Sequence, residues 1–75
     1  MQDRWFWIIE NTATGESLQW NQDIIIFADE DEAKEMLSLV PQSFREVAEI
    51  KHVIGFFDYK INYSEIREQV LEGDI

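Results

Sequence analysis

The most constraining stretch of this sequence is an apolar run, residues 24–27, followed almost at once by the acidic residues 29–32. Three of the four apolar residues are β-branched, and the run is short, which is typical of a strand covered on both faces. Asp29 has the position of a helix N-cap, and Glu32, three residues later, completes a capping box by reaching back to the Asp29 N–H. The stretch therefore predicts a buried strand that turns directly into a helix.

The predicted helix has one apolar face and an acidic start. Its apolar residues recur at helical spacing; they are Ala33, Met36, Leu37 and Val40. Five acids occupy residues 29–35, where the positive end of the helix dipole favours them. Pro41 ends the helix, because the residue before a proline is pushed out of the α region.

The N-terminal part predicts an antiparallel meander. Residues 4–10 are apolar on both faces, which indicates a central strand. Residues 11–16 form a hairpin loop in which Gly15 takes the left-handed conformation. Residues 17–20 are a short second strand, and the buried run completes three strands.

Two interpretations remain open after Pro41. Ser43 and Glu46 form a second capping box, which predicts a short helical turn over residues 44–48. Residues 47–54 and 56–63 then alternate as two strands around Gly55. The competing interpretation extends the helical segment through His52.

The C-terminal stretch predicts a last helix over residues 65–72. Residues 64–75 either pack on the rest of the domain as a helix or form a frayed tail. Ser64 is its cap, and Gly73 can end it. Its narrow apolar stripe consists of Ile66, Val70 and Leu71.

We therefore expect a single small α+β domain over residues 1–75: a three-stranded antiparallel meander, with a further hairpin left open, packed by one main helix and a short C-terminal helix. An apolar fraction of 45% argues against disorder. The N-terminal residues do not resemble a signal peptide, no apolar run is long enough to span a membrane, and there is no cysteine. These features favour a cytoplasmic protein.

The residue types of enzyme active sites are scarce. His52 is the single histidine, no serine has the flanking glycines of a nucleophile elbow, and the three glycines are too far apart for a phosphate-binding loop. Residues 29–32 lack the evenly spaced ligand loop of a calcium site. We expect no enzyme activity, no metal and no cofactor, and we rank a small-molecule-binding domain below a protein-binding module.

Charge supplies the first candidate surface. The net charge of −10 disfavours direct binding to nucleic acid or to an anionic membrane and favours a basic protein surface. The acids expected to face such a partner are Glu30, Asp31 and Glu35 on the main helix and Glu65, Glu68 and Glu72 on the last. In size and charge the chain is similar to small acidic inhibitors encoded by phages and mobile elements, including anti-CRISPR proteins and other nucleic-acid mimics. That similarity implies an inhibitor of a nucleic-acid-handling protein that acts by occupancy.

Aromatic residues supply the second candidate surface. The ten aromatic residues are more than one main helix can cover. An interface would contain Trp5, Trp7 or Trp20 on one face of the sheet, or Phe6 and Phe56 on the other. Exposed aromatic patches commonly mark interfaces. The alternative function is therefore a homodimeric accessory domain with an aromatic interface.

Overall fold

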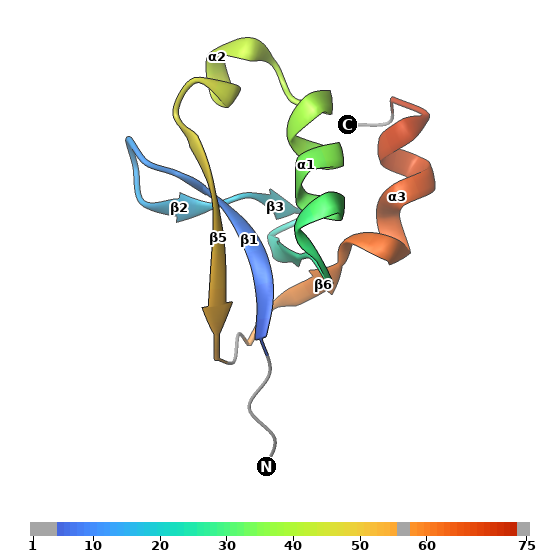
Figure 1. Cartoon of the computed structure of the whole chain (residues 1–75). Coiled ribbons are helices and arrows are strands. Elements are labelled where there is room, and N and C mark those ends of the chain that lie inside the picture. Colours follow the sequence, from blue (N-terminus) through green and yellow to red (C-terminus); the bar gives the residue numbers. More distant parts are fainter. Residues whose placement is uncertain (1–4, 56–57, 74–75) are drawn as a thin grey trace.

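The computed structural model describes residues 5–55 and 58–73, and Figure 1 shows how their elements are arranged. In chain order these are β1 (Trp5–Asn11), β2 (Glu16–Ser17), β3 (Gln19–Trp20), β4 (Asp23–Ile26), α1 (Glu30–Leu39), α2 (Gln42–Arg45), β5 (Ala48–Ile54), β6 (Lys60–Asn62) and α3 (Tyr63–Leu71). The predicted α+β fold, with one main helix and a short C-terminal helix, is confirmed. None of the helices among these residues has the length and apolarity needed to cross a membrane.

The strands form two three-stranded sheets, in the orders β2-β1-β5 and β3-β4-β6. The predicted middle strand, residues 17–20, is divided between them at Leu18. The Leu18 N–H donates to the Ile9 carbonyl at 2.7 Å, and the Leu18 carbonyl accepts from Ile25 at 3.1 Å. Trp7 and Phe27 exchange a second pair of bonds, both 2.9 Å long. The meander is therefore one curled layer, in which the end of β4 returns to β1.

The core lies between this curled layer and the helices. β1 is central, as predicted, because β2 and β5 pair with its two edges. One face of β1 places Ile9 in the core with α1, while Phe6 and Ile8 on the other face are also buried. The core residues that make one continuous cluster are Ile9, Ile25, Phe27, Ala33, Met36, Val40, Tyr63, Ile66 and Val70.

The pairing predicted for residues 47–63 is wrong. β5 does not form a hairpin with the next strand; it pairs antiparallel with β1 over its full length, from Trp5↔Ile54 to Asn11↔Ala48. β6 pairs with β4 instead, in parallel register. The helical alternative through His52 is also wrong. The alternation of residues 56–63 identified strand character correctly for 60–62, but periodicity carries no information about which edge a strand will meet.

The local signals at α1 are confirmed with one difference. The Asp29 carboxylate caps the helix by accepting from the Glu32 N–H at 2.9 Å. The Glu32 carboxylate reaches back to the Ala28 N–H at 3.0 Å, one residue before the predicted partner. Val40, in an extended conformation before Pro41, ends the helix. Two side-chain hydrogen bonds, one accepted by Asp29 and one by Glu32, therefore stabilise the turn from strand to helix.

The two shorter helices begin earlier than predicted. α2 begins after Pro41, so Ser43 lies inside it and caps nothing. α3 begins after Asn62 rather than after Ser64, and the Glu65 carboxylate accepts from the Asn62 N–H at 3.2 Å. In each case the N-cap is the last residue with a non-helical backbone, Pro41 for α2 and Asn62 for α3.

Candidate functional site

Helices α1 and α3 stand side by side on the same side of the sheet layer (Figure 1), joined by a contact among three side chains. The Glu35 carboxylate on α1 accepts from Arg67 Nε at 2.6 Å, from Arg67 Nη2 at 2.9 Å and from the Tyr63 hydroxyl at 2.7 Å. The Arg67 and Tyr63 hydrogen bonds lower the pKa of Glu35 to about 2. Burial, followed by the adjacent Glu35 carboxylate, raises the pKa of Tyr63. This contact locks the two helices together.

Glu35 therefore differs from the other acids predicted to meet a partner. Its side chain is only 34% exposed, and its charge is already matched by the Arg67 guanidinium. A bidentate arginine–carboxylate pair with a third donor holds the carboxylate in a fixed position within the fold. The structure thus places Glu35 in the seam between the helices, outside the acidic surface that the sequence predicts.

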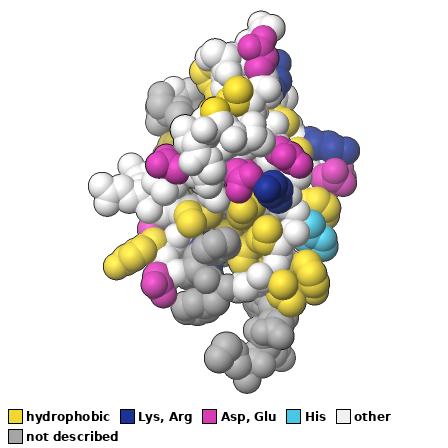
Figure 2. Space-filling model, turned by 90° about the vertical axis from the view of Figure 1, so that its left-hand side faces the viewer, with side chains coloured by type: hydrophobic (Ala, Val, Ile, Leu, Met, Phe, Trp, Pro, Cys, Tyr) yellow, Lys and Arg dark blue, Asp and Glu magenta, His cyan; other side chains and the backbone are white. Residues whose placement is uncertain are grey.

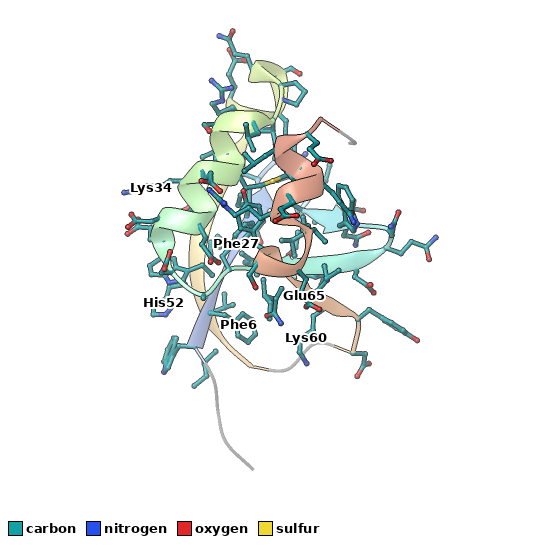
Figure 3. All side chains as sticks on the ribbon, turned by 90° about the vertical axis from the view of Figure 1, so that its right-hand side faces the viewer. Phe6, Phe27, Lys34, His52, Lys60 and Glu65 are labelled. Carbon is teal, nitrogen blue, oxygen red and sulfur yellow. The ribbon has the colours of Figure 1, made fainter. Side chains whose placement is uncertain are left out.

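The acids of α3 form a row on its outer side. Glu65, Glu68 and Glu72 are exposed and follow each other at intervals of three and four residues. At about 100° per residue this spacing places them opposite Ile66 and Val70, which are buried in the core. Figure 3 looks onto this side of the molecule, with α3 in front and Glu65 at its start. Among the described residues, no ion pair involves any of the three.

The acids at the start of α1 lie on the neighbouring helix. Glu30 and Asp31 are exposed, and Glu30 has a long contact of 3.8 Å to Lys34, one turn later. Exposed pairs of this kind contribute little energy and leave the carboxylate open to other cations. The structure thus brings five of the six predicted acids onto the outer surfaces of two adjacent helices, with the Glu35–Arg67 seam between them.

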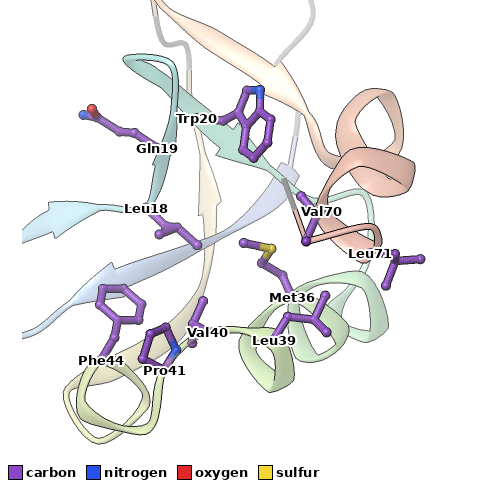
Figure 4. Close-up of a pocket in the computed structure, with 11 residues that line it drawn as sticks. Leu18, Gln19, Trp20, Met36, Leu39, Val40, Pro41, Phe44, Val70 and Leu71 are labelled. Carbon is purple, nitrogen blue, oxygen red and sulfur yellow. The ribbon is translucent and has the colours of Figure 1, made fainter. Parts of the chain in front are cut away.

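An apolar groove opens at the far end of the same helix pair (Figure 4). It has a volume of about 590 Å³. Leu39 on α1 and Leu71 on α3 line it and are 40% and 46% exposed, although Leu71 was predicted to be part of the buried stripe. The full lining consists of Leu18, Gln19, Trp20, Met36, Leu39, Val40, Pro41, Phe44, Val70, Leu71 and Gly73. The volume is that of ligand pockets, about 300–1,000 Å³, but no charged side chain among the described residues lines this one to select a ligand.

The predicted aromatic surface is divided. Trp5 is 60% exposed at the start of β1, and Trp7 stacks on His52 with ring centroids 4.1 Å apart and an angle of 7° between the planes. In Figure 2 the histidine lies against apolar side chains at the edge of the molecule. Trp20 instead lines the groove. Phe56, the fourth predicted residue, lies outside the described residues.

Two side chains of types used in catalysis, His52 and Ser38, have contacts within the fold. His52 contacts Trp5 and Trp7, and the Ser38 hydroxyl donates to the Glu35 carbonyl at 2.6 Å, an arrangement internal to α1. Within residues 5–55 and 58–73, no three His, Asp or Glu side chains are grouped in a way that could hold a metal ion. The acids of residues 29–32 are used in part as helix caps.

Sequence reasoning missed the partners of Glu35. Arg67 is 32 residues away in the chain, and nothing local connects the two. Tyr63 was assigned to a strand, although Asn62 and Glu65 have the spacing of a capping box and could have indicated the helix start. The groove had no local signal, since its lining comes from β3, α1, α2, α3 and their connections.

The comparisons with known proteins add no functional information. The chain matches no protein-family model, no curated protein and no solved structure.

Proposed function

We propose that this chain is a non-enzymatic protein-binding module that acts by occupancy, presenting the outer acids of α3 and α1 to a basic surface of a nucleic-acid-handling protein. The observation that supports this most directly is the row of Glu65, Glu68 and Glu72. It is exposed, and the ion pairs found among the described residues do not include it.

The spacing of the row is suited to imitation of a phosphate backbone. Seven residues of helix rise about 10.5 Å, so the three carboxylates lie about 5 Å apart along the axis. A nucleic-acid strand carries one charge per about 3.4 Å of its axis. The two line charges are of the same order, so a groove built for phosphates would attract α3.

Electrostatics would govern the encounter. Complementary charge raises the association rate and is screened by salt, with a Debye length of about 10 Å at 0.1 M. The net charge of −10 opposes binding to nucleic acid itself, which makes the basic protein the favoured partner. Binding would block the partner's nucleic acid without any chemical step.

The test compares two variants with the same change in net charge. Glu68→Lys/Glu72→Lys reverses the row, while Glu16→Lys/Glu46→Lys reverses two exposed acids outside it. Each immobilised protein is exposed to cell lysate, and captured proteins are identified by mass spectrometry. Candidates are then purified and titrated with and without duplex DNA.

We expect the wild type to capture a nucleic-acid-binding protein. Duplex DNA should displace this protein, and moderate salt should release it. The α3 variant should fail to bind it, while the control variant should still bind it. Equal loss with both variants would mean that net charge alone attracts basic proteins. Binding that duplex DNA does not affect would contradict mimicry of nucleic acid.

A further inference from the structure

The outer edge of β5 is an unpaired strand edge among the described residues. β5 is the last strand in the order β2-β1-β5, so only one of its two edges is paired, with β1. Figure 1 shows β5 next to β1. Seven residues is long for an exposed edge, and such edges pair readily with other strands.

The backbone bonds of β1 show which β5 residues face outward. Trp7 directs both its backbone N–H and its carbonyl to Phe27, and the Ile9 carbonyl accepts from Leu18. Their β5 partners are His52 and Ile50. These two pairs are therefore non-hydrogen-bonded pairs of the antiparallel ladder, in which the N–H and C=O groups of each residue point away from the opposite strand. The backbone groups of His52 and Ile50, and by alternation those of Ala48 and Ile54, therefore point to the free edge.

One face of β5 carries a charge pattern that a second copy would complete. Glu49 lies directly opposite Glu10 on β1, which is an unfavourable like-charge pair. Lys51, on the same face, is already paired with Glu10 at 2.7 Å. Glu49 has no ion pair among the described residues. A cation brought to the free edge would therefore stabilise Glu49.

We propose that two copies of this chain associate through β5, antiparallel and centred on Ile50, to form one continuous sheet. In this register the two Ile50 residues exchange backbone bonds, and Ala48 does so with His52 of the other copy. Glu49 then faces the second copy's Lys51 in a closely spaced pair, twice by symmetry. A shift of the centre to Glu49 or to Lys51 would place like charges opposite each other, so charge favours this register over those two neighbours.

This association is independent of the proposed partner surface, because β5 contains none of the outer acids of α1 and α3. It opposes the net charge of −10 on each chain, so salt that screens the long-range repulsion should strengthen it. That direction is opposite to the salt dependence expected for binding a basic partner.

The experiment is a charge exchange on the full chain. Glu49→Lys places an ammonium group against Lys51 of the second copy but relieves the Glu10 repulsion within one copy. Lys51→Glu places two acids opposite each other. The control, Glu16→Lys, makes the same charge change as Glu49→Lys away from β5. Sedimentation equilibrium up to millimolar concentration gives the dimer dissociation constant, and thermal melting checks that each variant is folded.

We expect the wild type and Glu16→Lys to dimerise, and Glu49→Lys to weaken the dimer at least about tenfold because two contacts change sign. An equimolar mixture of Glu49→Lys and Lys51→Glu should restore a dimer, since every facing pair is again of opposite charge. If Lys51→Glu does not fold, Glu49→Lys and its control decide the question. Amide exchange of Ile50 and His52 should slow as the dimer forms. A wild type that stays monomeric, or a dimer that Glu49→Lys does not weaken, would overturn the proposal.

Discussion

Tyr63 donates its hydroxyl to the same Glu35 oxygen that Arg67 Nε contacts, at 2.7 Å. The tyrosine begins α3, is fully buried and lies with its ring centroid 5.1 Å from that of Phe27. Its phenol thus connects the aromatic core to the seam between α1 and α3. The position of α3, and with it the direction of the acidic row, depends on this contact.

The contact predicts the effect of Tyr63→Phe. The ring and its packing on Phe27 remain, while the bond to a charged acceptor is lost. We expect a loss of about 1.5–3 kcal/mol in the free energy of unfolding, because a bond to a charged group contributes more than one between neutral groups. Denaturation in urea measures it, and Tyr59→Phe, an exposed tyrosine, is the control that should change nothing. Equal stability of Tyr63→Phe and the wild type would show that solvent replaces this bond.

The same contact predicts an acid-dependent loss of stability. Arg67 first, and then Tyr63, lower the pKa of Glu35 from 4.5 to about 2. A group whose folded pKa is depressed stabilises the fold above its unfolded pKa, and this contribution is lost as the pH falls through the folded value. The stabilisation by Glu35 is therefore complete above about pH 4.5 and disappears towards pH 2.

The measurement compares wild type with Glu35→Gln by urea denaturation from neutral pH down to about pH 2. The variant should be less stable at neutral pH and should approach the wild type in acid, because glutamine cannot gain a proton. A difference that stays constant with pH would contradict the assigned pKa.

The hairpin between β1 and β2 predicts a position-specific effect of glycine replacement. Gly15 has φ +78°, its N–H donates to the Asn11 carbonyl at 2.7 Å, and a Cβ there would meet nothing within 4 Å. Only backbone strain opposes a side chain, so Gly15→Ala should cost about 1–2 kcal/mol. Gly15→Asn should cost less, because asparagine tolerates the left-handed region. If Gly15→Ala and Gly15→Asn have the same denaturation midpoint as the wild type, residue 15 does not adopt the left-handed conformation in solution.

The parts of the fold that the sequence predicted are those with local causes. The β-branched run, the Asp29 cap and the left-handed Gly15 each involve neighbouring residues. The local errors are small shifts, such as the start of α3 at Tyr63. The larger errors concern contacts between distant segments: the parallel pairing of Ile61 with Ile25, and the arginine that already pairs with Glu35. A charge pattern shows which residues face outward on a helix, but the pairing of one charge by another helix requires the tertiary structure.

The C-terminal end of α3 predicts a conflict between stability and binding. Glu72 is at the C-cap, where the helix dipole disfavours a negative charge, and Glu68 is one turn before it, a like-charge pair. α3 has no basic residue in its last turn. These acids therefore weaken the helix that carries them.

Glu72→Lys should remove the repulsion, create a favourable pair with Glu68 one turn earlier and complement the dipole. We expect the thermal midpoint to rise by about 2–4 °C, and binding to a basic partner to weaken. Glu72→Gln, which removes the charge without reversing it, should fall between the wild type and the lysine variant in both measurements. A lysine variant that is more stable and binds as tightly as the wild type would show that Glu72 lies outside the contact, and the acidic surface would then have to be centred on the start of α3 and α1.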